Sequence, residues 1–250
     1  MKKGAFICAA AMLCVACTME AAESEMTGQS QSAIIGGNED AADPAVVAVY
    51  ARVPGETKGS LCTGEVISPT VVLTAAHCIT EVTPGSVHYV VPGGKFQSVP
   101  ASQWLAVKEV HADPAFDAAH LEAGHDIGVV ILAKPTTIRP LPFLRVPLPD
   151  EAVGHRVRLV GYGLDNGFRQ TGAGTKRTVT VPIVSMDDVT LETGNLFQKA
   201  CSGDSGGPAF LDIDGQETIV GITSYGYIFC LFDAFYTRVD LYTDFIERYL

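Results

Sequence analysis

The sequence predicts an all-β fold. Short runs rich in Val, Ile, Thr and Tyr recur along the chain with turn signals between them, a pattern typical of strands rather than helices. The 25 glycines and 14 prolines among 250 residues supply those turns. A chain of this length is about the upper size for one core, or for two small barrels that share an interface.

Apolar runs from Ile34 onward predict two sets of strands. The first set covers residues 46–53, 71–76, 87–91, 104–110 and 128–132, and we interpret residues 54–60 as a turn. The second set covers residues 155–163, 177–184, 208–213, 217–226 and 235–239. Proline lacks a backbone donor and is rare inside a sheet, so the proline-rich residues 138–150 predict a connection between two halves.

The end of the chain predicts an amphipathic α-helix over residues 240–250. Its apolar side chains fall on one face at helical spacing, and the charged ones fall elsewhere. These apolar residues are Leu241, Phe245, Ile246, Tyr249 and Leu250. We expect this helix to pack on the body of the protein.

The N-terminus resembles an export signal. Lys2 and Lys3 precede an apolar stretch, residues 4–16, that is too short to span a bilayer but suits a secretory signal. We expect residues 1–22 to be a signal peptide, 23–33 a polar pro-segment and 34–250 the folded domain. Cys17 ends a stretch that loosely resembles a bacterial lipobox. A lipid anchor on Cys17 and ordinary cleavage near Ala21 or Ala22 both remain open.

Charge and cysteine content narrow the class of protein. Seventeen basic and 28 acidic residues give a net charge of -11, which repels phosphate backbones and argues against nucleic acid as a partner. Four cysteines lie outside the leader: Cys62, Cys78, Cys201 and Cys230. In an exported domain they predict two disulfides, with three pairings open. No paired CxxC spacing supports a zinc site.

Three short motifs could carry chemistry. In CSGDSGGP, residues 201–208, glycines flank Ser205, so its hydroxyl is accessible and backbone amides can converge on a developing oxyanion. The alternative is a tight turn with polar filling. In LTAAHC, residues 73–78, His77 closes an apolar strand and could act beside a nucleophile. Asp126 leads into the apolar run 128–132, where a buried carboxylate needs a partner such as histidine.

A metal enzyme is the alternative suggested by a group of polar residues before Asp126. His111, His120, Glu122 and His125 offer metal-binding side chains, but their spacing matches neither HExxH nor another strong metal signature. We interpret them as surface residues and predict no metal site.

Four motifs in chain order resemble the trypsin and chymotrypsin family of serine peptidases. They are IIGG at 34–37, TAAHC at 74–78, DIGVV at 126–130 and CSGDSGGP at 201–208, with softer matches at 110–116, 161–163, 224–226 and 236–246. The resemblance implies two six-stranded antiparallel β-barrels, a C-terminal α-helix and an active site between the barrels. It identifies the chain as a bacterial-type secreted member, which we expect to act as a monomer on protein or peptide substrates.

The resemblance also implies roles for single residues. Ser205 would attack the scissile carbonyl, His77 would take and return the proton, and Asp126 would orient the imidazole. The backbone amides of Gly203 and Ser205 would form the oxyanion hole, and Ser224 would support the aspartate. A non-catalytic homologue that only binds proteins is the alternative in another class, but such homologues usually lose a triad residue, and this chain keeps all three.

The same resemblance implies disulfides and an activation step. Cys62 would pair with Cys78, and Cys201 with Cys230, and neither metal nor cofactor is needed. Cleavage by an activating protease before Ile34 would free an ammonium that pairs with Asp204. Ala33, where the family usually has Arg or Lys, argues against activation by a trypsin-like enzyme.

The specificity pocket departs from that of trypsin. Lys199 stands six residues before Ser205, where trypsin has an acidic residue, and it would repel a basic side chain. One hypothesis is that Lys199 attracts acidic P1 residues, with Gly226 and Ala234 on the pocket wall. The alternative is that Lys199 turns away or pairs with Asp233, which leaves a neutral pocket of elastase or chymotrypsin type.

Overall fold

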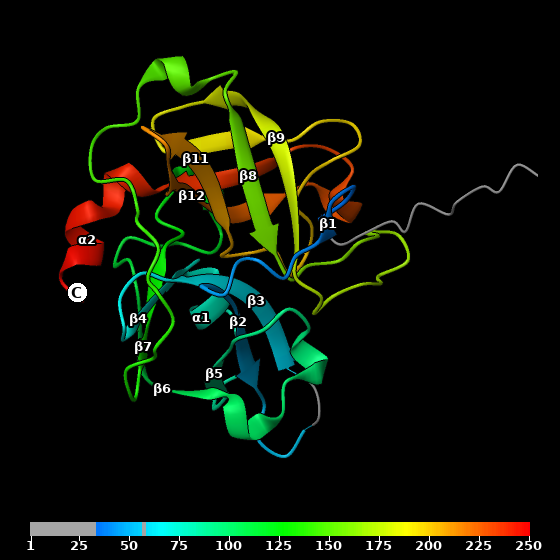
Figure 1. Ribbon diagram of the computed structural model, residues 1–250, viewed down its shortest axis with the longest axis vertical. Helices are drawn as coiled ribbons and strands as arrows, with labels where there is room; N and C mark the ends of the chain where they lie inside the picture. The colour runs from blue at the N-terminus through cyan, green and yellow to red at the C-terminus, as the bar shows by residue number, and fades with distance from the viewer. Residues whose placement is uncertain (1–33, 57–58) are drawn as a thin grey trace, which may run out of the picture. The chain divides into compact units, whose positions relative to one another are not determined.

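The first half of the chain forms a closed barrel of six antiparallel strands (Figure 1). The computed structural model describes residues 34–56 and 59–250. Around the barrel the strands follow the order β2-β3-β4-β7-β6-β5. Their bounds are Val46–Arg52 (β2), Gly59–Val66 (β3), Val71–Thr74 (β4), Val87–Val91 (β5), Leu105–Ala112 (β6) and Gly128–Leu132 (β7). A short helix, α1 (His77–Thr80), follows β4, and 3₁₀ turns lie at Phe96–Ser98, Ala101–Gln103 and Leu121–Ala123.

The second half forms another closed barrel of six antiparallel strands. Its ring runs β8-β9-β10-β13-β12-β11, and β8 and β11 also pair. The bounds are Arg156–Gly161 (β8), Arg177–Met186 (β9), Thr190–Thr193 (β10), Pro208–Ile213 (β11), Gln216–Gly226 (β12) and Ala234–Arg238 (β13). The short β1 (Asn38–Glu39) adds to the edge of β9. The predicted architecture of two six-stranded barrels is therefore confirmed.

Most predicted strands are confirmed, but residues 54–60 are not all turn. Gly59 and Ser60 begin β3, and β1 and β10 were also not predicted. β3 carries Gly64 and Glu65, two residue types that strands disfavour. The strand forms because its backbone pairs along its whole length with β2, from Val46 opposite Glu65 to Arg52 opposite Gly59.

The C-terminal helix is shorter than predicted. A 3₁₀ turn spans Val239–Tyr242 and α2 spans only Thr243–Glu247, where residues 240–250 were predicted. The Asp240 carboxylate accepts the Leu148 N–H at 2.9 Å, which fixes this turn to the preceding connection. Phe245 and Ile246 are buried as expected, whereas Leu241 and Leu250 are exposed.

The two barrels share one buried apolar cluster. It joins residues of the first barrel, such as Val49 and Leu73, to Val160 and Phe210 of the second. Residues 138–150 connect the barrels as predicted, and Phe143 in this connection bridges to Ile219 of β12. The interface between the barrels is thus packed like a single core.

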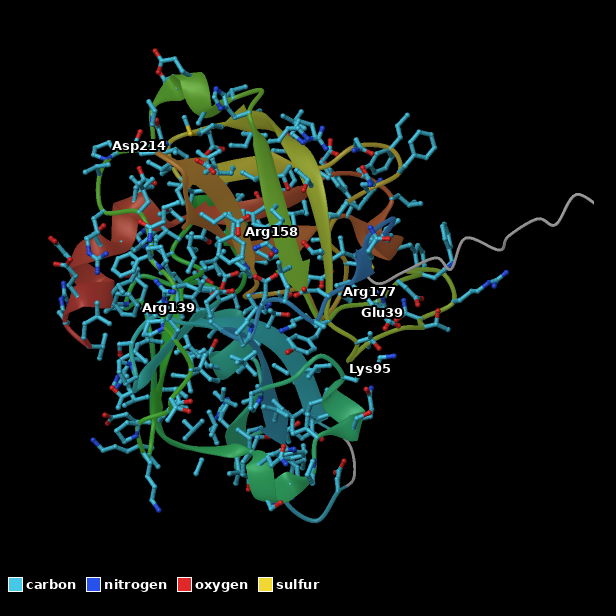
Figure 2. The ribbon with its side chains drawn as sticks, in the orientation of Figure 1. Glu39, Lys95, Arg139, Arg158, Arg177 and Asp214 are labelled. Atoms are coloured by element: carbon cyan, nitrogen blue, oxygen red, sulfur yellow. A yellow bond between two sulfur atoms is a disulfide. The ribbon has the colours of Figure 1, made fainter. Side chains whose placement is uncertain are left out.

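Charged side chains fasten the segment between Ile34 and β2. Arg158 of β8 forms ion pairs with Asp43 at 2.5 Å and with Glu217 at 2.6 Å (Figure 2). Glu39 lies opposite Arg177 in the β1–β9 pairing and forms an ion pair with Lys95 at 3.1 Å (Figure 2). The segment that follows Ile34 is therefore held against the second barrel by both backbone pairing and charge.

The predicted signal peptide (residues 1–22), its Cys17 and the pro-segment (residues 23–33) lie outside the described residues. Residues 34–250 fall within one compact unit. Among the residues described, no helix is long and apolar enough to cross a membrane.

Glu65 is a buried carboxyl group at the centre of the first barrel. It lies between Val46 of β2 and Leu73 of β4, is fully buried, and neither carboxyl oxygen has a hydrogen-bond partner among the described residues. Burial raises the pKa of Glu65 well above its ordinary value. The folded protein therefore holds a proton that the unfolded chain releases above about pH 4.5. Glu65 therefore lowers the free energy of unfolding by an amount that grows as pH rises above about 4.5.

We expect Glu65→Leu to stabilise the protein by about 1–3 kcal/mol at neutral pH, since it removes an unpaired buried polar group at little change in volume. Urea unfolding monitored at several pH values measures this. The gain should shrink as pH falls toward and below 4.5, because the wild-type side chain then becomes neutral in the unfolded chain as well. Glu151→Leu, at an exposed position, is the matched control and should have little effect. A destabilised Glu65→Leu protein would show that the carboxyl group has a partner.

Candidate active site

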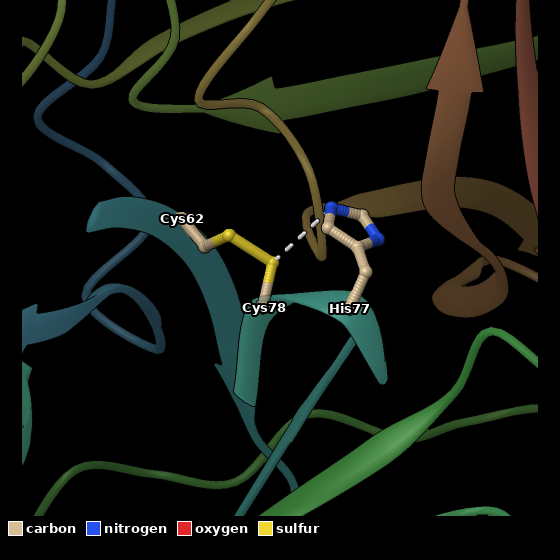
Figure 3. A group of neighbouring side chains, drawn as sticks. All are labelled: Cys62, His77 and Cys78. Carbon is tan, nitrogen blue, oxygen red and sulfur yellow. Dashed lines mark hydrogen bonds between the residues drawn. A yellow bond between two sulfur atoms is a disulfide. The ribbon is translucent and has the colours of Figure 1, made fainter. Parts of the chain in front are cut away.

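His77 lies at the start of α1, directly after β4. The neighbouring Cys78 forms a disulfide with Cys62 of β3, and this bond fixes α1 to the barrel wall (Figure 3). The Nε2 atom of His77 lies 3.6 Å from the Cys78 sulfur. The imidazole is therefore positioned by a covalent link one residue away. This disulfide is one of the two that the resemblance implied.

His77 and Asp126 form a hydrogen-bonded pair. The His77 Nδ1 atom lies 2.8 Å from Oδ2 of Asp126, and the His77 backbone N–H donates to Oδ1 at 2.9 Å. Ser224 of β12 donates its hydroxyl to Oδ2 of Asp126, and Thr237 of β13 donates to the Asp126 carbonyl at 3.0 Å. Two strands of the second barrel thus hold an aspartate that belongs to the first.

These contacts keep the Asp126 carboxyl group ionised. Asp126 is fully buried, and burial alone would raise its pKa. The His77 ring, the Ser224 hydroxyl and the His77 N–H together outweigh burial and lower the pKa of Asp126 below its usual range. An ionised carboxylate at Nδ1 holds the proton on that nitrogen and leaves Nε2 free to accept one.

The turn at residues 201–207 presents unpaired backbone N–H groups. Among the described residues, the N–H groups of Asp204, Gly206 and Gly207 donate to carbonyl oxygens, whereas those of Ser202, Gly203 and Ser205 have no acceptor. Gly203 has φ +98°, a backbone conformation that side chains rarely adopt. The N–H groups of Gly203 and Ser205 are the pair that an oxyanion would need.

The backbone of Ser205 is hydrogen-bonded to the first barrel. Its carbonyl oxygen accepts the N–H of Thr63 at 2.8 Å, and the Thr63 hydroxyl donates to the Gly203 carbonyl at 2.9 Å. Thr63 lies next to Cys62, whose disulfide leads to Cys78 and so to the residue after His77. Ser205 also lines the same pocket as Ser224, which binds Asp126. Hydrogen bonds and one disulfide, which involve both barrels, therefore link the predicted nucleophile, base and aspartate.

Asp204 and Ile34 are both buried in the second half of the molecule. The Asp204 carboxylate accepts the N–H groups of Gly163 and Cys201, each at 2.8 Å. Burial raises the pKa of Asp204 to about 7, although both hydrogen bonds act to lower it. The Ile34 side chain packs in the core of the second barrel, and Ile35 bridges to Lys199. A buried carboxylate with this pKa is poorly compensated, so a nearby cation would stabilise it.

A pocket of about 100 Å³ opens beside Ser205. Two predicted wall residues, Gly226 and Ala234, line it, and so does Asp233. The second disulfide, Cys201–Cys230, runs along its side. Lys199, which one hypothesis expected to attract an acidic P1 side chain, is not among the residues that line the pocket.

Lys199 is buried behind the pocket wall. Its ammonium donates to the carbonyl oxygens of Leu231 at 3.0 Å and Leu196 at 3.3 Å. Burial lowers the pKa of Lys199, and the Asp233 carboxylate opposes this shift. Burial and the charge of Glu192 raise the pKa of Asp233, and Lys199 acts in the opposite direction. The two charges therefore influence each other, while the ammonium itself is engaged by backbone oxygens.

Two groups of polar side chains could suggest a metal. Cys62, His77 and Cys78 place their ligand atoms within 4.8 Å of one another, but the two sulfur atoms are bonded to each other in the disulfide and are not thiolates. The histidines before Asp126 pair with separate carboxylates instead of converging. These pairs are His111–Glu109 at 3.7 Å, His120–Glu122 at 3.1 Å and His125–Asp113 at 3.1 Å.

Several residues of this site were not predicted. Thr63 and Thr237 lie in strands whose hydroxyl groups give no signal in the sequence. Tyr227 and Phe232 line the pocket from a loop with no secondary-structure pattern. Only the alternation of aromatic residues around Cys230 could have pointed to this loop.

Comparison with known proteins agrees with the geometry. The family model described as trypsin matches residues 34–246. The trypsin of Phaedon cochleariae is 31% identical over 219 residues, which cover 75% of this chain and 78% of that protein. The chymotrypsin of Phaedon cochleariae is 30% identical over 217 residues, covering 78% and 74%. Phenoloxidase-activating factor 3 of Holotrichia diomphalia is 29% identical over 226 residues, covering 75% and 63%. These comparisons do not support the expected bacterial type.

Proposed function

Because this chain belongs to the trypsin family of serine peptidases, we propose that His77, Asp126 and Ser205 are its catalytic triad. The family makes it a serine-type endopeptidase, and its substrates are proteins. The observation that supports the residue assignment is the chain of hydrogen bonds from Ser224 through Asp126 to His77. Beside it lies a turn in which the Gly203 and Ser205 N–H groups have no acceptor among the described residues.

The geometry supports a two-step hydrolysis. Ser205 Oγ attacks the peptide carbonyl carbon as His77 Nε2 takes the hydroxyl proton, and the Gly203 and Ser205 N–H groups bind the resulting oxyanion. His77 then gives this proton to the leaving amine, the C–N bond breaks, and an acyl-enzyme remains. Water, deprotonated by His77, attacks the acyl carbon and releases the acid and the Ser205 hydroxyl. Asp126 stays ionised throughout and stabilises the imidazolium.

A serine-directed organophosphorus reagent tests this proposal. It should form a covalent adduct on Ser205, located by mass spectrometry of the peptide that contains residues 201–208, and hydrolysis should stop in proportion to labelling. Enzyme that stays active and unlabelled, or that is labelled at another serine, would reject the assignment.

We propose that the chain is made as a zymogen. Cleavage between Ala33 and Ile34 would free an ammonium for the buried Asp204 carboxylate, whose hydrogen-bond donors among the described residues are two backbone N–H groups. Ile35 and β1 are paired with the second barrel, in which Asp204 is buried, and this supports the idea. Intact-mass analysis should find active protein beginning at Ile34. Active protein that retains Ala33 would contradict it.

For P1 we propose a preference for uncharged apolar residues. Lys199 lies behind the pocket wall with its ammonium bound to two carbonyl groups, and Asp233 partly compensates its charge, which favours a neutral pocket over an acid-binding one. Peptides that differ only at P1 should be cut fastest with Leu, more slowly with Glu or Arg. A preference for Glu that Lys199→Met abolishes would restore the acidic-P1 hypothesis.

We also propose secretion through the signal at residues 1–22, with the protein acting as a monomer. The two disulfides support export, because disulfides persist in oxidising compartments. Mass spectrometry of the processed precursor distinguishes cleavage near Ala21 or Ala22 from a diacylglycerol group on Cys17. Protein that keeps its leader inside the cell would contradict export.

A further inference from the structure

Six large apolar side chains are exposed on three loops, two of them lining the pocket, and we call them the apolar rim. Each exposes between 50% and 79% of its surface. The rim consists of Phe168, Leu196, Phe197, Tyr227, Phe229 and Phe232. Isolated exposed apolar residues are common, but a cluster of this kind marks a binding surface.

The aromatic rings of the rim are held in place by one another. Phe168 and Phe229 stack with ring centroids 5.2 Å apart and planes 11° from parallel. Tyr227 and Phe232 meet edge to face, also at 5.2 Å. Gly167 permits the first stack, because a Cβ atom there would lie 2.2 Å from the Phe229 carbonyl oxygen. The loop around residue 168 and the loop at 227–232 therefore form one surface.

Lys199 links the other two rim residues, Leu196 and Phe197, to the loop at 227–232. Its buried ammonium donates to the Leu196 carbonyl on one loop and to the Leu231 carbonyl on the other. Leu196 and Phe197 are thereby held beside the loop that carries Tyr227, Phe229 and Phe232. A lysine in this position clamps two loops together and leaves no ammonium for the substrate.

The rim is continuous with the pocket. Tyr227 and Phe232 belong to the rim and also line the pocket next to Ser205. The Cys201–Cys230 disulfide ties the rim loop to the turn that carries the nucleophile. A polypeptide with one side chain in the pocket can therefore place a neighbouring residue on the rim. Aromatic side chains are enriched at interfaces and among the residues that carry their binding energy.

We propose that the apolar rim binds an apolar segment of the protein substrate next to the scissile bond. This proposal rests on the proposed function, in which Ser205 cleaves a peptide whose P1 side chain occupies the pocket. The enzyme then selects its substrates by two features, the P1 residue and a neighbouring apolar stretch. The second feature acts on binding, so it changes KM and leaves kcat unaltered.

Two peptides test the proposal on the activated full domain. Both contain the same P1 and P1′ residues, and one has leucine and the other serine at every remaining position. The wild-type KM should be about tenfold lower for the leucine peptide. In the double variant Phe168→Ala/Phe197→Ala, which leaves the pocket lining intact, the KM for the leucine peptide should rise about tenfold, with kcat unchanged. Val146→Ala, at an exposed apolar site in the inter-barrel connection, is the control and should behave as wild type.

Hydrolysis of a small ester of the P1 amino acid distinguishes a failure of the proposed function from a failure of the rim proposal. The ester occupies the pocket without reaching Phe168 or Phe197, which do not line the pocket, so all three proteins should hydrolyse it equally. Equal hydrolysis also shows that the variants are folded. No ester hydrolysis by the wild type would reject the proposed function itself. Ester hydrolysis with equal KM for both peptides would overturn the rim proposal alone. A shift from dimer to monomer in the double variant, seen by sedimentation without any change in KM, would show instead that the rim binds a second copy of the chain.

Discussion

Replacing Ser205 with alanine should lower kcat by about 10⁶-fold, because the acyl-enzyme can no longer form and His77 and Asp126 have no nucleophile to act on. The folded state should be unaffected, since Ser205 holds the first barrel through its backbone carbonyl, which alanine retains. Active-site titration followed by peptide hydrolysis measures the loss. KM should change little, because the pocket walls remain.

Ser202→Ala provides the matched control for Ser205→Ala. Ser202 is an exposed serine in the same turn, and its removal should leave covalent labelling by an organophosphorus reagent complete, whereas Ser205→Ala should abolish it. Residual labelling of the Ser205→Ala protein, or activity within tenfold of wild type, would mean that another residue is the nucleophile.

Replacing Asp126 with asparagine should lower kcat by about 10⁴-fold. The amide is nearly isosteric, but its NH₂ group donates, whereas His77 Nδ1–H, the His77 backbone N–H and Ser224 all require acceptors. The imidazole then carries its proton on the wrong nitrogen, and the imidazolium formed during attack loses its counter-charge. Single-turnover kinetics should show the loss in acylation. Asp214→Asn, in the turn between β11 and β12, should leave the rate unchanged.

The Asp126→Asn variant also has an expected signature in stability. The pKa of Asp126 is lowered in the folded state, so the folded protein binds fewer protons there than the unfolded chain. This contribution is present above about pH 3.8 and is lost as pH falls through the folded-state value. The variant should therefore show a shallower loss of stability in acid. An unchanged acid profile would mean that Asp126 is not ionised in the folded protein.

The local motifs were predictable because each is a short pattern of neighbouring residues. A glycine-flanked serine, a histidine at the end of an apolar run and an aspartate before another apolar run all remain visible without a structure. Apolar runs likewise predicted most strands. β3 was not predicted because Gly64 and Glu65 disfavour a strand locally, and barrel closure overrides that preference.

The orientation of Lys199 could not be predicted from the sequence. Sequence position places this residue near the pocket, but the direction of its ammonium depends on the carbonyl groups of Leu196 and Leu231, which come from two loops far apart in the chain. The same holds for Thr63 and for the rim stack of Phe168 on Phe229. Contacts that join distant loops leave no pattern in the sequence, because each partner is an ordinary surface or strand residue.

His77 and Asp126 belong to the first barrel, whereas Ser205 and Ser224 belong to the second. The turnover rate should therefore depend on how accurately the two barrels are positioned relative to each other. A core substitution far from the pocket, at Phe210 or Leu73 for example, can displace one barrel by a fraction of an ångström and slow catalysis although every reacting group is intact. On heating, such an enzyme should lose activity at a lower temperature than it loses β-structure. The difference between these two temperatures measures how firmly the interface holds the two barrels in position.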